Sequence, residues 1–101
     1  MIEQKKTIER EQRVPRFIQK EDGCEILSND GSMKVILSLT RNFNGQMETE
    51  FYNATYYARD EEREYEKLDT SLTFHSIEEY MGKLENNEDY SEAYRDYKES
   101  V

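Results

Sequence analysis

Hydrophobic and polar positions alternate along most of the chain between residues 14 and 74. The period is two, which is typical of β-strands that bury one face. In the clearest case, Met33, Val35, Leu37 and Leu39 fall on one face of a strand. We therefore expect residues 14–74 to form antiparallel strands.

Glycine-containing turn signals divide this region. Asp-Gly between alternating runs is a strong hairpin signal, and glycine can adopt the positive φ that tight turns need. Consecutive hairpins predict a meander of four or five antiparallel strands. The expected turns are Glu21-Asp22-Gly23, Asn29-Asp30-Gly31 and the segment from Asn42 to Gly45.

The second half of the strand region holds two further alternating runs. The first, 46–58, places Met47, Thr49, Phe51 and Tyr57 on one face and Glu48, Glu50, Tyr52 and Tyr56 on the other. The second, 66–74, places Leu68, Thr70, Leu72 and Phe74 on one side. Residues 59–68 also suit a helix that begins near Glu61, but the alternation favours a strand.

Helical spacing replaces alternation after residue 75. Ser76 followed by Glu79 fits a capping box, in which the hydroxyl and the carboxylate accept hydrogen bonds from backbone N–H groups at the helix start. Two helices are expected within residues 76–99, separated by Asn86-Asn87. Their apolar stripes consist of Ile77, Tyr80, Met81 and Leu84, and of Tyr90, Ala93, Tyr94 and Tyr97. The predicted fold class is α+β, with both helices packed on one face of the sheet.

Charge is distributed unevenly along a chain with a net charge of −9. Residues 1–13 form a basic N-terminal arm or short helix, which must end before Pro15 because the residue that precedes proline avoids helical geometry. Residues 59–101 are rich in Asp and Glu. No linker or repeat divides the chain, so residues 1–101 are expected to form a single domain.

No motif in the sequence identifies a catalytic centre. The one histidine, His75, has no nucleophile motif near it. The one cysteine, Cys24, is interpreted as a buried residue of a strand. One histidine and one cysteine cannot form a structural zinc site within one chain, and no glycine-rich phosphate loop is present. We expect a protein that is not an enzyme and that binds no cofactor or metal.

Apolar runs are too short for a membrane span or a secretion signal. The single cysteine suits a reducing compartment. The sequence thus predicts a cytoplasmic protein that does not bind membranes. Direct nucleic-acid binding is not expected, because phosphate affinity requires an excess of Lys and Arg.

Acidic side chains are the strongest functional signal. Rows of carboxylates on helices can imitate a track of phosphates and bind a groove lined by Lys and Arg. The predicted partner-binding residues are Glu85, Glu88, Asp89, Glu92, Asp96 and Glu99, with Asp60, Glu61 and Glu62. This predicts an inhibitor or regulator that occupies the basic, nucleic-acid-binding surface of a protein partner.

Small acidic counter-defence proteins of phages and mobile elements, including anti-CRISPR proteins, have this general character; the likeness is one of type and assigns no residue a role. Two alternatives remain at this point. One is a structural module that associates with itself as a homodimer, since the apolar core is thin and a sheet edge invites pairing. The other is an accessory subunit that binds a protein partner without a basic surface. If the negative charge serves only to keep the protein soluble, both alternatives remain.

Overall fold

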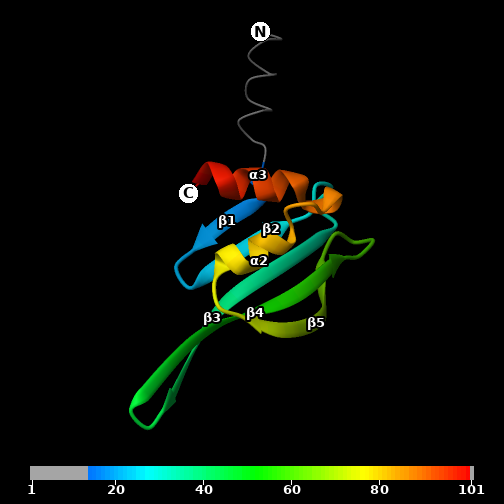
Figure 1. Cartoon of the computed structure of the whole chain (residues 1–101). Helices are drawn as coiled ribbons and strands as arrows, with labels where there is room; N and C mark the ends of the chain where they lie inside the picture. The colour runs from blue at the N-terminus through cyan, green and yellow to red at the C-terminus, as the bar shows by residue number, and fades with distance from the viewer. Residues whose placement is uncertain (1–13, 101) are drawn as a thin grey trace, which may run out of the picture.

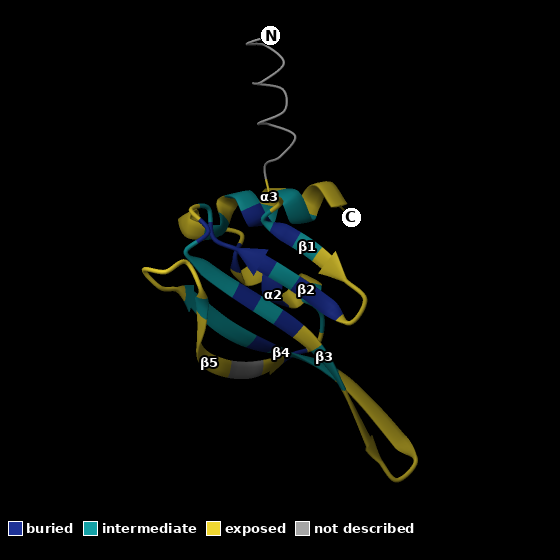
Figure 2. Ribbon diagram, turned by 180° about the vertical axis from the view of Figure 1, so that it is seen from behind, coloured by how far each residue is buried: buried dark blue, intermediate teal, exposed yellow. Residues whose placement is uncertain are grey.

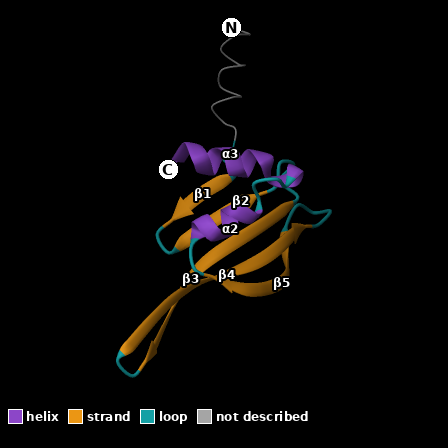
Figure 3. Cartoon of the chain, in the orientation of Figure 1, coloured by secondary structure: helices purple, strands orange, loops and turns teal. Residues whose placement is uncertain are grey.

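The computed structural model describes residues 14–100, apart from the side chains of Ser71 and Leu72; the expected N-terminal arm lies outside this range. Five strands are followed by two α-helices, which confirms the α+β class (Figure 1, Figure 3). The strands are β1 (Phe17–Lys20), β2 (Gly23–Leu27), β3 (Met33–Asn44), β4 (Met47–Arg59) and β5 (Tyr65–Phe74). The helices are α2 (Ile77–Lys83), a 3-10 turn η1 (Glu88–Tyr90) and α3 (Ser91–Ser100).

The sheet is an antiparallel meander in the order β1-β2-β3-β4-β5, as predicted. Each connection between strands is short, so each strand pairs with the one that follows it. Residues 65–74 form a strand, which decides between the strand and helix alternatives for that part of the chain. The first two turns fall where the sequence predicts them.

The third turn lies closer to the C-terminus than predicted. Residues 42–44 remain in β3, and only Gly45 and Gln46 connect it to β4. Gly45 has φ of 66° and Gln46 has no positive φ, which fits the type II′ turn that two-residue hairpins favour. The predicted turn from Asn42 to Gly45 was therefore wrong in its position, because cross-strand pairing continues to the pair of Asn44 with Met47.

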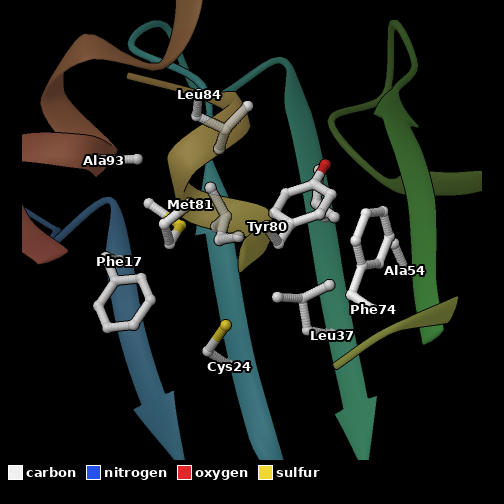
Figure 4. Packing of buried hydrophobic residues seen from close by; sticks show 11 residues of the cluster. Phe17, Cys24, Leu37, Ala54, Phe74, Tyr80, Met81, Leu84 and Ala93 are labelled. Atoms are coloured by element: carbon white, nitrogen blue, oxygen red, sulfur yellow. The ribbon is translucent and has the colours of Figure 1, made fainter. Parts of the chain in front are cut away.

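The helices pack on one face of the sheet and close the core, as Figure 4 shows. The capping box forms in part: Ser76 Oγ accepts from the N–H of Glu79, while the Glu79 carboxylate accepts from the N–H of His75, one residue before the cap. Side chains of α2 then meet those of the strands. The buried apolar cluster consists of Phe17, Cys24, Ile26, Val35, Leu37, Ala54, Phe74, Tyr80, Met81, Leu84 and Ala93.

Irregular pairing of β5 changes which of its residues face the core. Phe74 pairs with Tyr52 and is buried, but the register shifts twice before Lys67 pairs with Tyr57. Each shift inserts one residue and reverses the alternation. Thr70 pairs with Thr55, on the side opposite to Phe74, and Leu68 is 57% exposed, so the prediction that these residues share one side of the strand was wrong.

The other face of the sheet carries no described helix, as the view from behind in Figure 2 shows. The distal halves of β3 and β4 also extend beyond the helices as a two-stranded ribbon. We call residues 41–50, which are all exposed, the hairpin arm. Among residues 14–100, no helix has the length and apolar character needed to cross a bilayer.

Candidate partner-binding surface

Three segments meet at the end of the sheet that lies opposite the hairpin arm. The turn between β2 and β3 is central, because Asn29 donates from its backbone N–H to the Asp89 carbonyl and from Nδ2 to the Glu88 carbonyl, at 2.8 and 2.7 Å. On its other side, the Tyr65 hydroxyl donates to the Gly31 carbonyl at 2.6 Å. The β2–β3 turn thus joins η1 to the start of β5.

Exposed carboxylates gather where these segments meet. We call this surface the acidic end, and it consists of Asp30, Asp60, Glu61, Glu62, Glu64, Glu88 and Asp89. Five of these residues belong to the predicted partner-binding set, and the fold joins them although two stretches of sequence supply them. Asp30 and Glu64 were not predicted, because nothing in the local sequence shows that their turns lie beside η1.

Hydrogen bonds within the turns hold the acidic end in place. Asp60 Oδ1 accepts from the N–H groups of Glu62 and Glu64, both at 2.9 Å. Asp30 Oδ1 accepts from the side chain and the N–H of Ser32 and from the Ser28 hydroxyl. These bonds lower the pKa of Asp30 to about 2, so this carboxylate stays charged across the neutral range.

A pocket of about 370 Å³ opens within the acidic end. Asp30, Asp89 and Tyr90 are among the residues that line it. Burial, followed by the charge of Asp89, raises the pKa of Tyr90, so its hydroxyl stays protonated. Two anionic groups beside an aromatic ring suit the side chain of a lysine or arginine.

The four other predicted residues lie outside the acidic end as defined, although the backbone N–H of Glu92 donates to Asn29 Oδ1 in the β2–β3 turn at 3.0 Å. Glu85 is exposed and accepts a hydrogen bond from the Tyr94 hydroxyl at 3.1 Å. Glu92, Asp96 and Glu99 follow one another along α3, which runs along β1. Asp96 is half-buried, and its carboxylate accepts from the backbone N–H of Arg16. The acidic row on the last helix is thus partly used in docking that helix.

The tyrosine stripe of the C-terminal segment faces inward, as its spacing predicts. Tyr90, Tyr94 and Tyr97 are partly buried and pack against the core. The Tyr97 ring meets the Phe17 ring edge to face, with centroids 5.2 Å apart. These tyrosines therefore hold α3 on the sheet, and Tyr90 also lines the pocket at the acidic end.

The two candidate catalytic side chains differ sharply in exposure. Cys24 is 1% exposed, and burial raises the pKa of its thiol to about 12. His75 is exposed at the start of α2. Across residues 14–100, no three His, Cys, Asp or Glu side chains are grouped so that they could hold a metal ion.

Comparison of the chain with protein-family models, with curated proteins and with solved structures gave no match.

Proposed function

We propose that this protein inhibits or regulates a protein partner by placing its acidic end on the partner's nucleic-acid-binding surface. The observation that carries the proposal is the meeting of three chain segments at one end, which carries seven exposed acidic residues, two of them lining a pocket. Arg59 and Arg63 are the basic residues of the same turn region, so carboxylates dominate its field.

The geometry of the pocket supports a basic partner. A lysine or arginine side chain that enters it meets the lining residues Asp30, Asp89 and Tyr90. Charge-assisted hydrogen bonds to carboxylates are among the stronger polar contacts, and cation–π attraction adds to them. The remaining carboxylates of the acidic end accelerate the encounter with a cationic groove.

Competition with nucleic acid follows from this charge pattern. One DNA strand presents a phosphate about every 3.4 Å along the duplex axis, and a partner binds this track with clustered Lys and Arg. The carboxylates of the acidic end present the same sign of charge, so they compete with nucleic acid for the same groove. A nucleic-acid-binding protein of a host defence system, such as a CRISPR effector, is the kind of partner that we expect.

Affinity capture at two salt concentrations tests the proposal. The tagged protein is incubated with host lysate at about 0.1 M and about 0.5 M salt, which shortens the screening length to less than half. We expect capture of a nucleic-acid-binding protein that is lost at the higher salt and displaced by added duplex DNA. Binding that neither salt nor DNA weakens would contradict the proposal and favour an accessory role with a partner that is not basic.

Matched variants locate the contact on the molecule. The variant Glu61→Gln/Glu88→Gln/Asp89→Asn removes three charges from the acidic end. The control Glu21→Gln/Asp22→Asn/Glu48→Gln removes three exposed charges from the opposite end. We expect the first variant to weaken capture at least about tenfold and the control to change it little. Charges within the interface contribute more to affinity than charges at the far end of the molecule. Equal losses would show that only the net charge matters.

A further inference from the structure

The hairpin arm exposes apolar side chains without support from any other described element. Phe43 is 72% exposed and Met47 is 73% exposed. An isolated two-stranded ribbon is marginally stable in water, and its stability increases when a face is packed. The two faces of the ribbon differ in charge, and this difference indicates which kind of surface can pack on the arm.

One face of the ribbon is free of charge over its whole length. Cross-strand partners in an antiparallel sheet point to the same side, and alternate pairs give one face. On the side away from the helices, the pairs between β3 and β4 are Ile36 with Thr55, Ser38 with Asn53, Thr40 with Phe51, Asn42 with Thr49, and Asn44 with Met47. We call these residues the neutral face. None is charged, in a chain of which 37% of the residues are charged.

The opposite face of the same ribbon holds its charges. There Arg41 pairs with Glu50, with Nε and Oε1 3.0 Å apart, and Phe43 pairs with Glu48. Beside the neutral face on the body of the sheet, Glu25 forms ion pairs with Lys20 and Lys34, and Lys67 pairs with Tyr57 on the same side.

We propose that the neutral face is the surface on which a second copy of this chain docks, with the two arms related by a two-fold axis. Two chains with a net charge of −9 repel one another, and contact through an uncharged surface avoids placing carboxylates against carboxylates. A two-fold contact needs a self-complementary surface. Asn, Ser and Thr side chains both donate and accept hydrogen bonds, so a copy of the face can pair with itself.

Chemistry argues against the other classes of occupant. The neutral face offers no carboxylate to a basic groove and no Lys or Arg to phosphate. Phe51 and Met47 provide the apolar contact that such a surface needs at its centre and at its tip. The acidic end stays accessible in the dimer because it lies at the other end of the strands, so the proposal does not depend on the proposed function.

The expected dimer is weak to moderate in strength. Five pairs at alternate positions span roughly 27 Å along the strands, from a rise of about 3.3 Å per residue. Such a strip, extended by the adjoining sheet surface, belongs to the small class of protein interfaces. We therefore expect dissociation constants on the order of micromolar, and the experiment must reach well above that range.

Sedimentation equilibrium on the full chain tests the proposal, at loadings from about 1 μM to about 500 μM, which bracket a micromolar dissociation constant. Thr49→Glu places a carboxylate in the neutral face, so that the two-fold axis brings two such charges together. Phe43→Glu is the matched control, since it adds the same charge to the arm on the opposite face. Both positions are exposed, and far-UV circular dichroism checks that both variants fold.

We expect the wild-type chain to dimerise, Thr49→Glu to raise the dissociation constant at least about tenfold, and Phe43→Glu to keep it within about threefold. Backbone amide exchange in residues 41–50 should also slow as the wild-type concentration increases. A wild-type chain that stays monomeric throughout would overturn the proposal. Dissociation caused by Phe43→Glu to the same or a greater extent would overturn it too, because the charged face of the arm would then be the interface.

Discussion

The carboxylate of Asp96 accepts a hydrogen bond from the backbone N–H of Arg16, with 2.8 Å between Oδ2 and N, across 80 positions of sequence. This contact ties the middle of α3 to the residue before β1, at the outer edge of the sheet. The helix covers an edge strand that would otherwise present unpaired backbone groups. A residue predicted from its charge to bind a partner therefore also stabilises the fold.

The variant Asp96→Ala should lower the free energy of unfolding by about 1–2 kcal/mol, since hydrogen bonds to charged groups contribute in this range and the site is only partly buried. Urea denaturation measures the change. The exposed Glu99, one turn further along α3, provides the control: Glu99→Ala should change stability by less than about 0.5 kcal/mol. Equal effects of the two substitutions would show that the contact with Arg16 contributes nothing.

Gly23 is expected to tolerate no side chain. Its φ is 146°, and a Cβ there would lie 1.8 Å from the carbonyl oxygen of Leu37 on the neighbouring strand. Because that atom belongs to the backbone of the central strand, it cannot move without disturbing the pairing of β2 with β3. Gly23→Ala should cost more than about 2 kcal/mol, measured as a shift of the thermal and urea midpoints. A midpoint within error of the wild type would contradict the backbone geometry.

Gly82 should give the opposite result. It lies in α2, is exposed, and a Cβ built on it meets nothing within 4 Å. Alanine is favoured over glycine within helices by about 1 kcal/mol. Gly82→Ala should therefore raise the free energy of unfolding by up to about that amount, with no change in the contacts of Tyr80 or Met81. Destabilisation would mean that α2 makes a contact through this face.

Cys24 should resist alkylation in the folded protein. Its side chain is 1% exposed and burial raises the pKa of the thiol to about 12, so neither access nor thiolate is available near neutral pH. Iodoacetamide should modify it only as fast as the core opens, as followed by mass spectrometry. A cysteine placed in the hairpin turn by Gln46→Cys gives the fast reference. Similar rates at the two sites would contradict the burial.

The same shift sets an alkaline limit on stability. The pKa of Cys24 rises from 9.0 in the unfolded chain to about 12 in the folded one. The unfolded state therefore loses its proton first, and stability that is fully present below pH 9 declines as the pH approaches 12. Desolvation also raises the pKa of Tyr80, so its effect has the same sign. Urea midpoints measured across this range should fall.

At low pH, protonation of Asp30 should lower the stability of the fold. Hydrogen bonds from Ser32 and Ser28 lower the pKa of this carboxyl from 3.8 to about 2. A lowered folded-state pKa adds stability above the unfolded value, and this contribution is lost as the pH falls from 3.8 towards 2. Asp30→Asn should flatten the acid side of the stability profile. An unchanged profile would show that the β2–β3 turn does not depend on the charge.

Much of the fold follows from the local sequence. Alternation predicted β3 and β4, and the Asp-Gly pairs predicted the first two turns. The Ser76 cap and the tyrosine spacing predicted α2 and the inward face of α3. These features depend on neighbours within a few residues, where backbone geometry and hydrophobic periodicity dominate.

Local sequence patterns account for the strands, the helices, the first two turns and the excess of negative charge. The place where that charge gathers depends on the folded chain, because the β2–β3 turn, the β4–β5 turn and η1 meet through hydrogen bonds between distant residues. The tertiary structure also decided the two shifts in β5, the length of the hairpin arm and the second role of Asp96. Register, bulges and contacts between distant segments arise when elements pack together. The hydrophobic pattern within one element therefore does not predict them.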